Sequence, residues 1–150
     1  MAKFKYRLAT LLRLREAARD ERRTELAEAY RVDDVLREQL RQVEEALGGL
    51  RARCRSVAGP GRVNVDLLVE AQRYDVALRT RQHDLKKQRE AVAAEIERRR
   101  QAVVEADREV RVLEKLRQRQ ADRYLLEENR RQGKQLDEVA GQRAAREELV

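Results

Sequence analysis

The amino-acid sequence predicts an all-α fold, a long two-helix antiparallel coiled-coil hairpin with an overhanging C-terminal helix. Charged residues make up 42% of the 150-residue chain and aromatic residues only 3%, which is typical of coiled coils. Apolar residues recur every three or four positions over most of the length. The strong helix breaker Gly59-Pro60-Gly61 lies between two long helix-forming segments. The chain is therefore expected to fold back on itself as one coiled-coil domain, residues 1–150.

The first helix is expected over about residues 3–57, and the turn over about 58–65. From Leu26 onwards its apolar residues step by three and four, which is the 3.5-residue repeat of a coiled-coil seam, and only Asp33 interrupts them. This seam comprises Leu26, Ala29, Leu36, Leu40, Val43, Leu47, Leu50, Cys54 and Val57.

The second helix is expected over about residues 66–147, with Asn64 or Asp66 as its N-cap. Its predicted seam passes through Ala71, Tyr74, Leu78, Arg81, Leu85, Gln88, Val92, Ile96, Arg99, Val103, Ala106, Val110 and Leu113. A turn near Pro60 places Leu36 opposite Leu85 and brings Asp33 within reach of Arg89. Polar pairs at such positions fix the register of a coiled coil.

The first helix has no residues left to pair with the second beyond about Arg117. Residues 117–150 are therefore expected to form an overhang without an internal partner. Its apolar side chains and its arginines are expected to contact another molecule. The apolar ones are Tyr124, Leu125, Leu126 and Leu136, and the arginines include Arg117, Arg119, Arg123, Arg130 and Arg131.

The sequence predicts no catalytic, cofactor or metal site, and no enzymatic activity. His83 is the only histidine and Cys54 the only cysteine, so neither a histidine-based metal cluster nor a Cys–His dyad is expected within one chain. Cys54 is expected to pack in the seam. The net charge of +7 suits an acidic partner, but carboxylates lie among the basic runs, which argues against nucleic-acid binding. No apolar run is long enough to insert into a membrane.

Five segments, taken in order, resemble the FliJ family of flagellar protein-export components. They are Phe4-Lys5-Tyr6-Arg7-Leu8, Glu70-Ala71-Gln72-Arg73-Tyr74, the run from Val112 to Gln120, Glu127-Glu128-Asn129-Arg130-Arg131-Gln132, and the run from Leu136 to Arg143. The Asp137-Glu138-Val139-Ala140 ending favours the flagellar family over the analogous stalk of virulence secretion systems.

The resemblance implies a cytoplasmic stalk, peripheral at the inner face of the cell membrane, without a cofactor. Its implied partners are the hexameric flagellar export ATPase, which it enters and activates, the cytoplasmic domain of the export-gate membrane protein, and export chaperones. The ATPase is expected to contact Arg117, Arg119, Tyr124, Leu125, Leu126, Arg130, Arg131 and Leu136. The gate is expected to contact Gln39, Val43, Ala46, Leu50, Tyr74, Leu78, Arg81 and Leu85.

Three other interpretations stay open on the sequence alone. They are a generic self-associating coiled-coil scaffold, the stalk of a virulence type III secretion system, and a basic coiled coil that binds nucleic acid. Salt dependence separates the last of these from the others, because binding to phosphates weakens steeply as salt rises.

Overall fold

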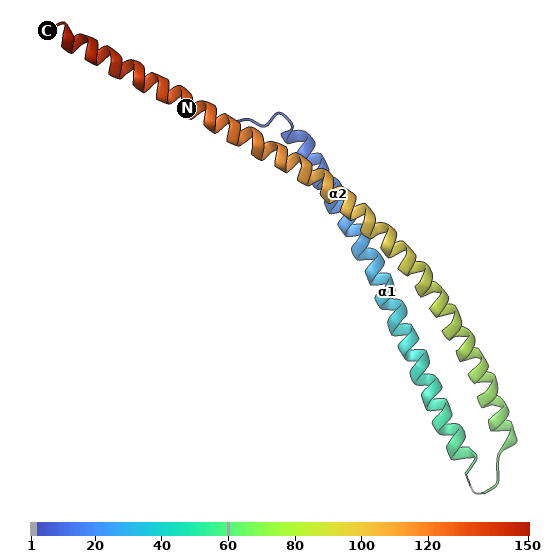
Figure 1. Cartoon of the computed structure of the whole chain (residues 1–150). Coiled ribbons are helices and arrows are strands. Elements are labelled where there is room, and N and C mark those ends of the chain that lie inside the picture. The colour runs from blue at the N-terminus through green and yellow to red at the C-terminus, as the bar shows by residue number, and fades with distance from the viewer. Residues whose placement is uncertain (1–2, 60) are drawn as a thin grey trace. The chain divides into compact units, whose positions relative to one another are not determined.

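Two helices make up almost all of the computed structural model, which describes residues 3–59 and 61–150. Helix α1 runs over Ala9–Val57 and helix α2 over Val65–Glu148, and the described residues contain no strand (Figure 1). The predicted all-α helical hairpin is confirmed. Contacts divide the chain into two compact units, residues 1–20 with 105–150, and residues 21–104. That residues 1–150 behave as one domain stays a prediction.

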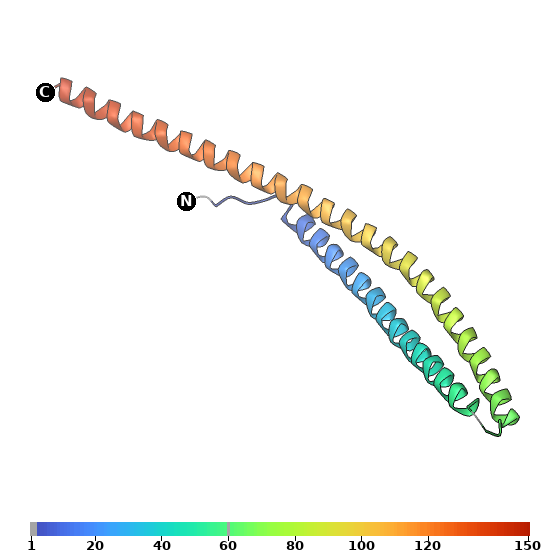
Figure 2. The same ribbon diagram turned by 60° about the horizontal axis from the view of Figure 1, so that its bottom comes forward.

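The connection between the helices lies within the unit of residues 21–104, where the two helical arms run antiparallel, side by side (Figure 2). Gly61 adopts a φ of +149°, a conformation that residues with a Cβ rarely accept. Of the two predicted N-caps, Asn64 is the one that caps α2, because its Oδ1 accepts hydrogen bonds from the backbone N–H groups of Asp66 and Leu67 at 3.1 and 3.4 Å. Pro60, on which the predicted turn was centred, lies outside the described residues.

A row of leucines and one valine forms the core of this unit. Its buried members are Leu36, Leu40, Val43, Leu47 and Leu50 from α1, with Leu78 and Leu85 from α2. Ala46, Cys54, Ala71 and Val92 are partly buried and pack against them. The prediction that Cys54 is a packing residue is confirmed. Helix α1 therefore contributes five of the seven buried side chains of this core and α2 contributes two.

The seam of α2 differs from the predicted one at three positions, all of them between Ala71 and Val92. Tyr74, Arg81 and Gln88 are exposed, and the partly buried residues are instead the next ones along, Asp75, Gln82 and Arg89. The two sets differ by one residue because positions on either border of a helical stripe fit a three-and-four spacing equally well. The exposure of Tyr74 and Arg81 leaves both side chains accessible to a partner.

Asp33 explains why Arg89 rather than Gln88 occupies the seam. The Asp33 side chain is buried, and its Oδ1 accepts a hydrogen bond from Arg89 Nε at 3.2 Å, as predicted. Its other oxygen, Oδ2, lies 3.1 Å from Nε of Arg37, one turn further along α1. A buried carboxylate without such partners would be costly, so this pair selects the register in which Asp33 and Arg89 meet.

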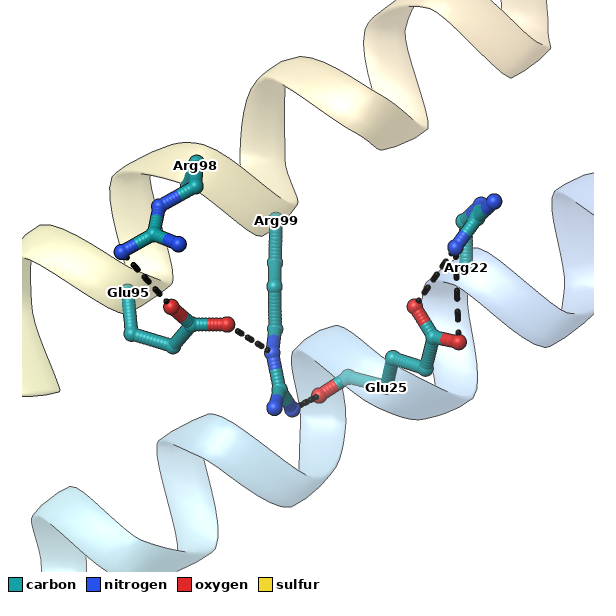
Figure 3. A network of polar contacts seen from close by, with 5 residues as sticks. All are labelled: Arg22, Glu25, Glu95, Arg98 and Arg99. Carbon is teal, nitrogen blue, oxygen red and sulfur yellow. Dashed lines mark hydrogen bonds and ion pairs between the residues drawn. The ribbon is translucent and has the colours of Figure 1, made fainter.

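A second polar layer lies further from the turn (Figure 3). Arg99 of α2 donates one hydrogen bond to the Glu95 side chain at 2.9 Å and another to the backbone carbonyl of Glu25 on α1. Arg22 of α1 belongs to the same layer, and its guanidinium donates a hydrogen bond to the Glu25 carboxylate at 3.1 Å. The hydrogen bond from Arg99, followed by the charge of Arg98, lowers the pKa of the Glu95 carboxyl. The Glu95 carboxylate therefore stays charged at neutral pH.

In the other unit, α1 begins at Ala9 instead of at about residue 3 as predicted. The buried residues here are Leu12 of α1 and Val110 and Leu113 of α2, and Tyr6 and Leu8 pack against them. The hydroxyl of Tyr6 donates a hydrogen bond to the Leu113 carbonyl at 2.9 Å. Residues 3–6 have no helical structure, because the contacts of this segment with α2 replace the helical turn that the sequence pattern favours.

Leu85→Ala should lower the free energy of unfolding by roughly 2–3 kcal/mol, because it removes a buried side chain and leaves a cavity in the core. The matched change Leu14→Ala, at a leucine that is 63% exposed, should change it by no more than about 0.5 kcal/mol. Urea denaturation followed by far-UV circular dichroism measures both. Equal effects of the two substitutions would contradict the assignment of Leu85 to the core.

Candidate partner-binding surfaces

The N-terminal segment, residues 3–8, lies along α2. Phe4, Tyr6 and Leu8 are partly buried, whereas Lys3, Lys5 and Arg7 between them are exposed. This alternation is that of an extended chain with one face against a surface. The ring of Phe4 lies 5.7 Å from the ring of Tyr124, measured between centroids, at an angle of 46°. The segment therefore shows three cations to solvent while its apolar side chains cover α2.

The extended conformation explains how far this segment reaches. Leu8 packs in the cluster that contains Leu113, and Tyr124 lies about 16 Å further along α2 at the helical rise. An extended residue adds about 3.3 Å of reach and a helical one about 1.5 Å. The non-helical residues 3–6, which precede a turn at Arg7 and Leu8, therefore reach further toward Tyr124 than a helix that began at residue 3 would. The prediction that Tyr124 lacks an internal partner is wrong, and so is the prediction that internal contacts stop near Arg117.

The exposed part of α2 begins just beyond this contact. From residue 125 to the C-terminus every described side chain is exposed apart from Glu128, and Gly133 is partly covered. Leu136 is 70% exposed and Leu125 58%. The structure therefore confirms the exposure of these two leucines and of Leu126, and moves the start of the exposed stretch from about residue 117 to residue 125.

The residues predicted to contact the ATPase do not share one face of α2. Leu125 and Leu136 lie on one side, about three turns apart. The other members lie on two further sides at intervals of one or two turns. These groups are Arg119, Leu126 and Arg130, and Arg117, Tyr124 and Arg131. The set surrounds the helix, so a partner that contacts all of it must enclose the helix.

Positive charge gathers on one stretch of this exposed helix. A shallow hollow in its surface is lined by Arg130, Arg131 and Lys134 around the single carboxylate of Glu127. The ion pairs found among the described residues involve none of these four side chains. The three cations are therefore available to an acidic partner.

The residues predicted to contact the gate separate into two groups. Val43, Leu50, Leu78 and Leu85 are buried in the core between the helices, and Ala46 is partly buried beside them. Their side chains hold the hairpin together and cannot reach a partner while it is closed. Gln39 is partly buried, whereas Tyr74 and Arg81 are exposed. Only these three, with the edge of Ala46, are accessible to another protein.

The accessible members lie on one side of the seam. Tyr74 and Arg53 line the same cleft near the connection, so this edge of α1 and this edge of α2 face the same way. Ala46 lies two turns from Arg53 on α1, and Arg81 two turns from Tyr74 on α2. The cleft has a volume of about 460 Å³ and a floor of Leu50, Cys54 and Ala71. We name this surface, Gln39, Ala46, Tyr74 and Arg81, the seam-edge face.

Over residues 3–59 and 61–150, no three histidine, cysteine, aspartate or glutamate side chains are grouped so that they could hold a metal ion. No helix in this part of the chain has an apolar stretch that would cross a membrane.

Comparison with protein families gives one result that covers nearly the whole chain. The family model described as Flagellar FliJ protein matches residues 4–149. Comparisons with curated proteins and with solved structures give no match. The matched range includes Phe4 at one end and the exposed part of α2 at the other.

Tyr6→Phe should loosen the N-terminal segment, because it removes the hydrogen bond to the Leu113 carbonyl, worth about 1 kcal/mol. Tryptic cleavage after Lys5 and Arg7 should then become about fivefold faster, relative to cleavage after Arg131 in the same digest. Mass spectrometry of the early products gives these rates. Tyr30→Phe, at an exposed tyrosine of α1, serves as the control. An unchanged cleavage ratio in Tyr6→Phe would show that the hydroxyl does not hold the segment.

Proposed function

This chain belongs to the FliJ family and is a component of the flagellar export apparatus, and on that premise we propose that it is a non-enzymatic stalk of the export ATPase. In this role it enters the centre of the hexameric ATPase, promotes its assembly and turnover, and contacts the cytoplasmic domain of the export-gate membrane protein. It works without a cofactor, as a cytoplasmic protein peripheral at the inner face of the cell membrane. Export chaperones are a further class of partner.

The observation that carries the ATPase assignment is the exposed stretch of α2 from residue 125 to Glu148. A single helix is about 10–12 Å wide, so it fits a narrow channel. A ring that encloses it can contact all sides at once, which suits a set of residues distributed around the helix. Leu125, Leu126 and Leu136 supply apolar area, and Arg130, Arg131 and Lys134 supply charge for an acidic lining.

The seam-edge face supports the gate assignment. It combines a half-exposed tyrosine with a cleft whose floor is apolar, and exposed aromatic side chains beside such clefts often dominate binding energy. The buried members of the predicted set contribute indirectly, because they fix the spacing of the two helices that carry Tyr74 and Gln39.

Removal of residues 125–150 should abolish stimulation of the purified export ATPase and leave the rest of the chain folded. Both buried clusters and the contact between Phe4 and Tyr124 lie within the part that remains. The thermal midpoint of the shortened protein should therefore stay within a few degrees of that of the full chain. Steady-state ATP turnover, with each protein added at equal concentration, measures the effect. Equal stimulation by both proteins would refute the assignment of this stretch to the ATPase.

Tyr74→Ala should weaken binding to the purified gate domain about 30-fold, which corresponds to the loss of about 2 kcal/mol expected at a tyrosine that dominates an interface. It should leave ATPase stimulation unchanged, since Tyr74 lies outside the exposed stretch of α2. Tyr30→Ala is the matched control, at a similarly exposed tyrosine of the same unit. Fluorescence titration gives both affinities, and equal losses in the two variants would remove the seam-edge face from the gate interface.

A further inference from the structure

The end of the hairpin carries positive charge without any carboxylate. Residues 46–65 contain Arg51, Arg53, Arg55 and Arg62 and no aspartate or glutamate. All four arginines are exposed, and none of them takes part in an ion pair among the described residues. Arg55 alone lies in the last turn of α1, where a cation stabilises the helix end. The other three have no such structural role.

These arginines project in different directions. On α1, Arg51 and Arg55 lie about 40° apart, and Arg53 lies on roughly the opposite side of the helix. The two clefts at this end reflect the same division, because Arg53 lines one and Arg51 and Arg55 line the other. Arg62 lies in the connection between the helices. The cations therefore surround the end of the hairpin instead of lining one groove.

Aliphatic side chains are exposed at the same end. Val63 is 46% exposed, Val65 66% and Leu67 50%, and all three lie in the connection or the first turn of α2. The N-terminal segment is also basic, and no carboxylate occurs before Glu16, but its apolar side chains are less accessible. Its apolar residues Phe4 and Tyr6 are committed to α2. Of these two basic segments without carboxylates, the end of the hairpin is therefore the one that combines free cations with free aliphatic side chains.

We propose that this end, residues 51–59 and 61–67, docks on a membrane surface that contains anionic lipid. A plane of negative charge met end-on can attract cations that point in several directions, whereas an acidic helix or protein patch needs them on one face. Each arginine near such a surface strengthens binding about fivefold. The three aliphatic side chains add contact with the boundary between headgroups and acyl chains. The inference goes beyond the proposed stalk function and needs neither the ATPase nor the gate.

Vesicle sedimentation with the full chain tests the proposal. The probes are vesicles of phosphatidylcholine with 30% phosphatidylglycerol, and vesicles of phosphatidylcholine alone, at low and moderate salt. The test variant is Arg51→Gln with Arg53→Gln and Arg55→Gln. The matched control is Lys3→Gln with Lys5→Gln and Arg7→Gln, which lowers the net charge by the same three units at the other basic, carboxylate-free segment. Circular dichroism establishes that both variants stay folded.

The wild-type chain should bind the anionic vesicles, and less so as salt rises, because salt screens exposed charges. The test variant should bind them about 100-fold more weakly, and the control variant within about threefold of wild type. Equal losses in both variants would overturn the proposal, since net charge alone would then explain binding. Absence of binding, or equal binding to neutral vesicles, would overturn it too. Soluble polyglutamate serves as a further probe, in place of an acidic protein. If the test variant loses binding to polyglutamate but keeps binding to the anionic vesicles, the surface belongs to an acidic protein and the proposal is overturned.

Discussion

A two-helix hairpin can bury only one stripe of each helix, and this limit governs the structure. In residues 21–104 almost every buried side chain lies on that stripe, and α1 supplies most of them. A polar residue there must find its partner on the same stripe. Asp33 does so with Arg89 across the interface and with Arg37 on its own helix. The pairing sets the register, and the register decides which side chains of α2 face solvent.

Contacts with α2 also determine the backbone conformation of the N-terminal segment. A helical start at residue 3 would give up about half of the reach along α2 that an extended chain has. Because residues 3–6 are not helical, Phe4 meets Tyr124 and the Tyr6 hydroxyl donates a hydrogen bond to the Leu113 carbonyl. Local helix propensity yields here to contacts that are distant in sequence. The result is a defined point on α2 beyond which no described part of the chain covers it.

The surfaces accessible to partners consist of side chains that lie outside the buried seam between the helices. One is the end of α2, whose leucines and arginines surround a single helix. Another is the seam-edge face, where Tyr74 and Arg81 lie just outside the core. The third is the end of the hairpin, with its unpaired arginines. All three surfaces are exposed in the folded chain, and family membership places the chain in the flagellar export apparatus.

The sequence by itself determined the two helices, the place of the turn, the seam of α1 and the meeting of Asp33 with Arg89, and it limited the N-cap of α2 to Asn64 or Asp66. These follow from periodicity, helix breakers and the cost of a buried charge, all of which can be read locally. The start of α1, the partner of Tyr124 and the exposure of Tyr74 and Arg81 were decided only by the tertiary structure. Each depends on which of two neighbouring positions, or which of two backbone conformations, makes the better contact with a helix distant in sequence.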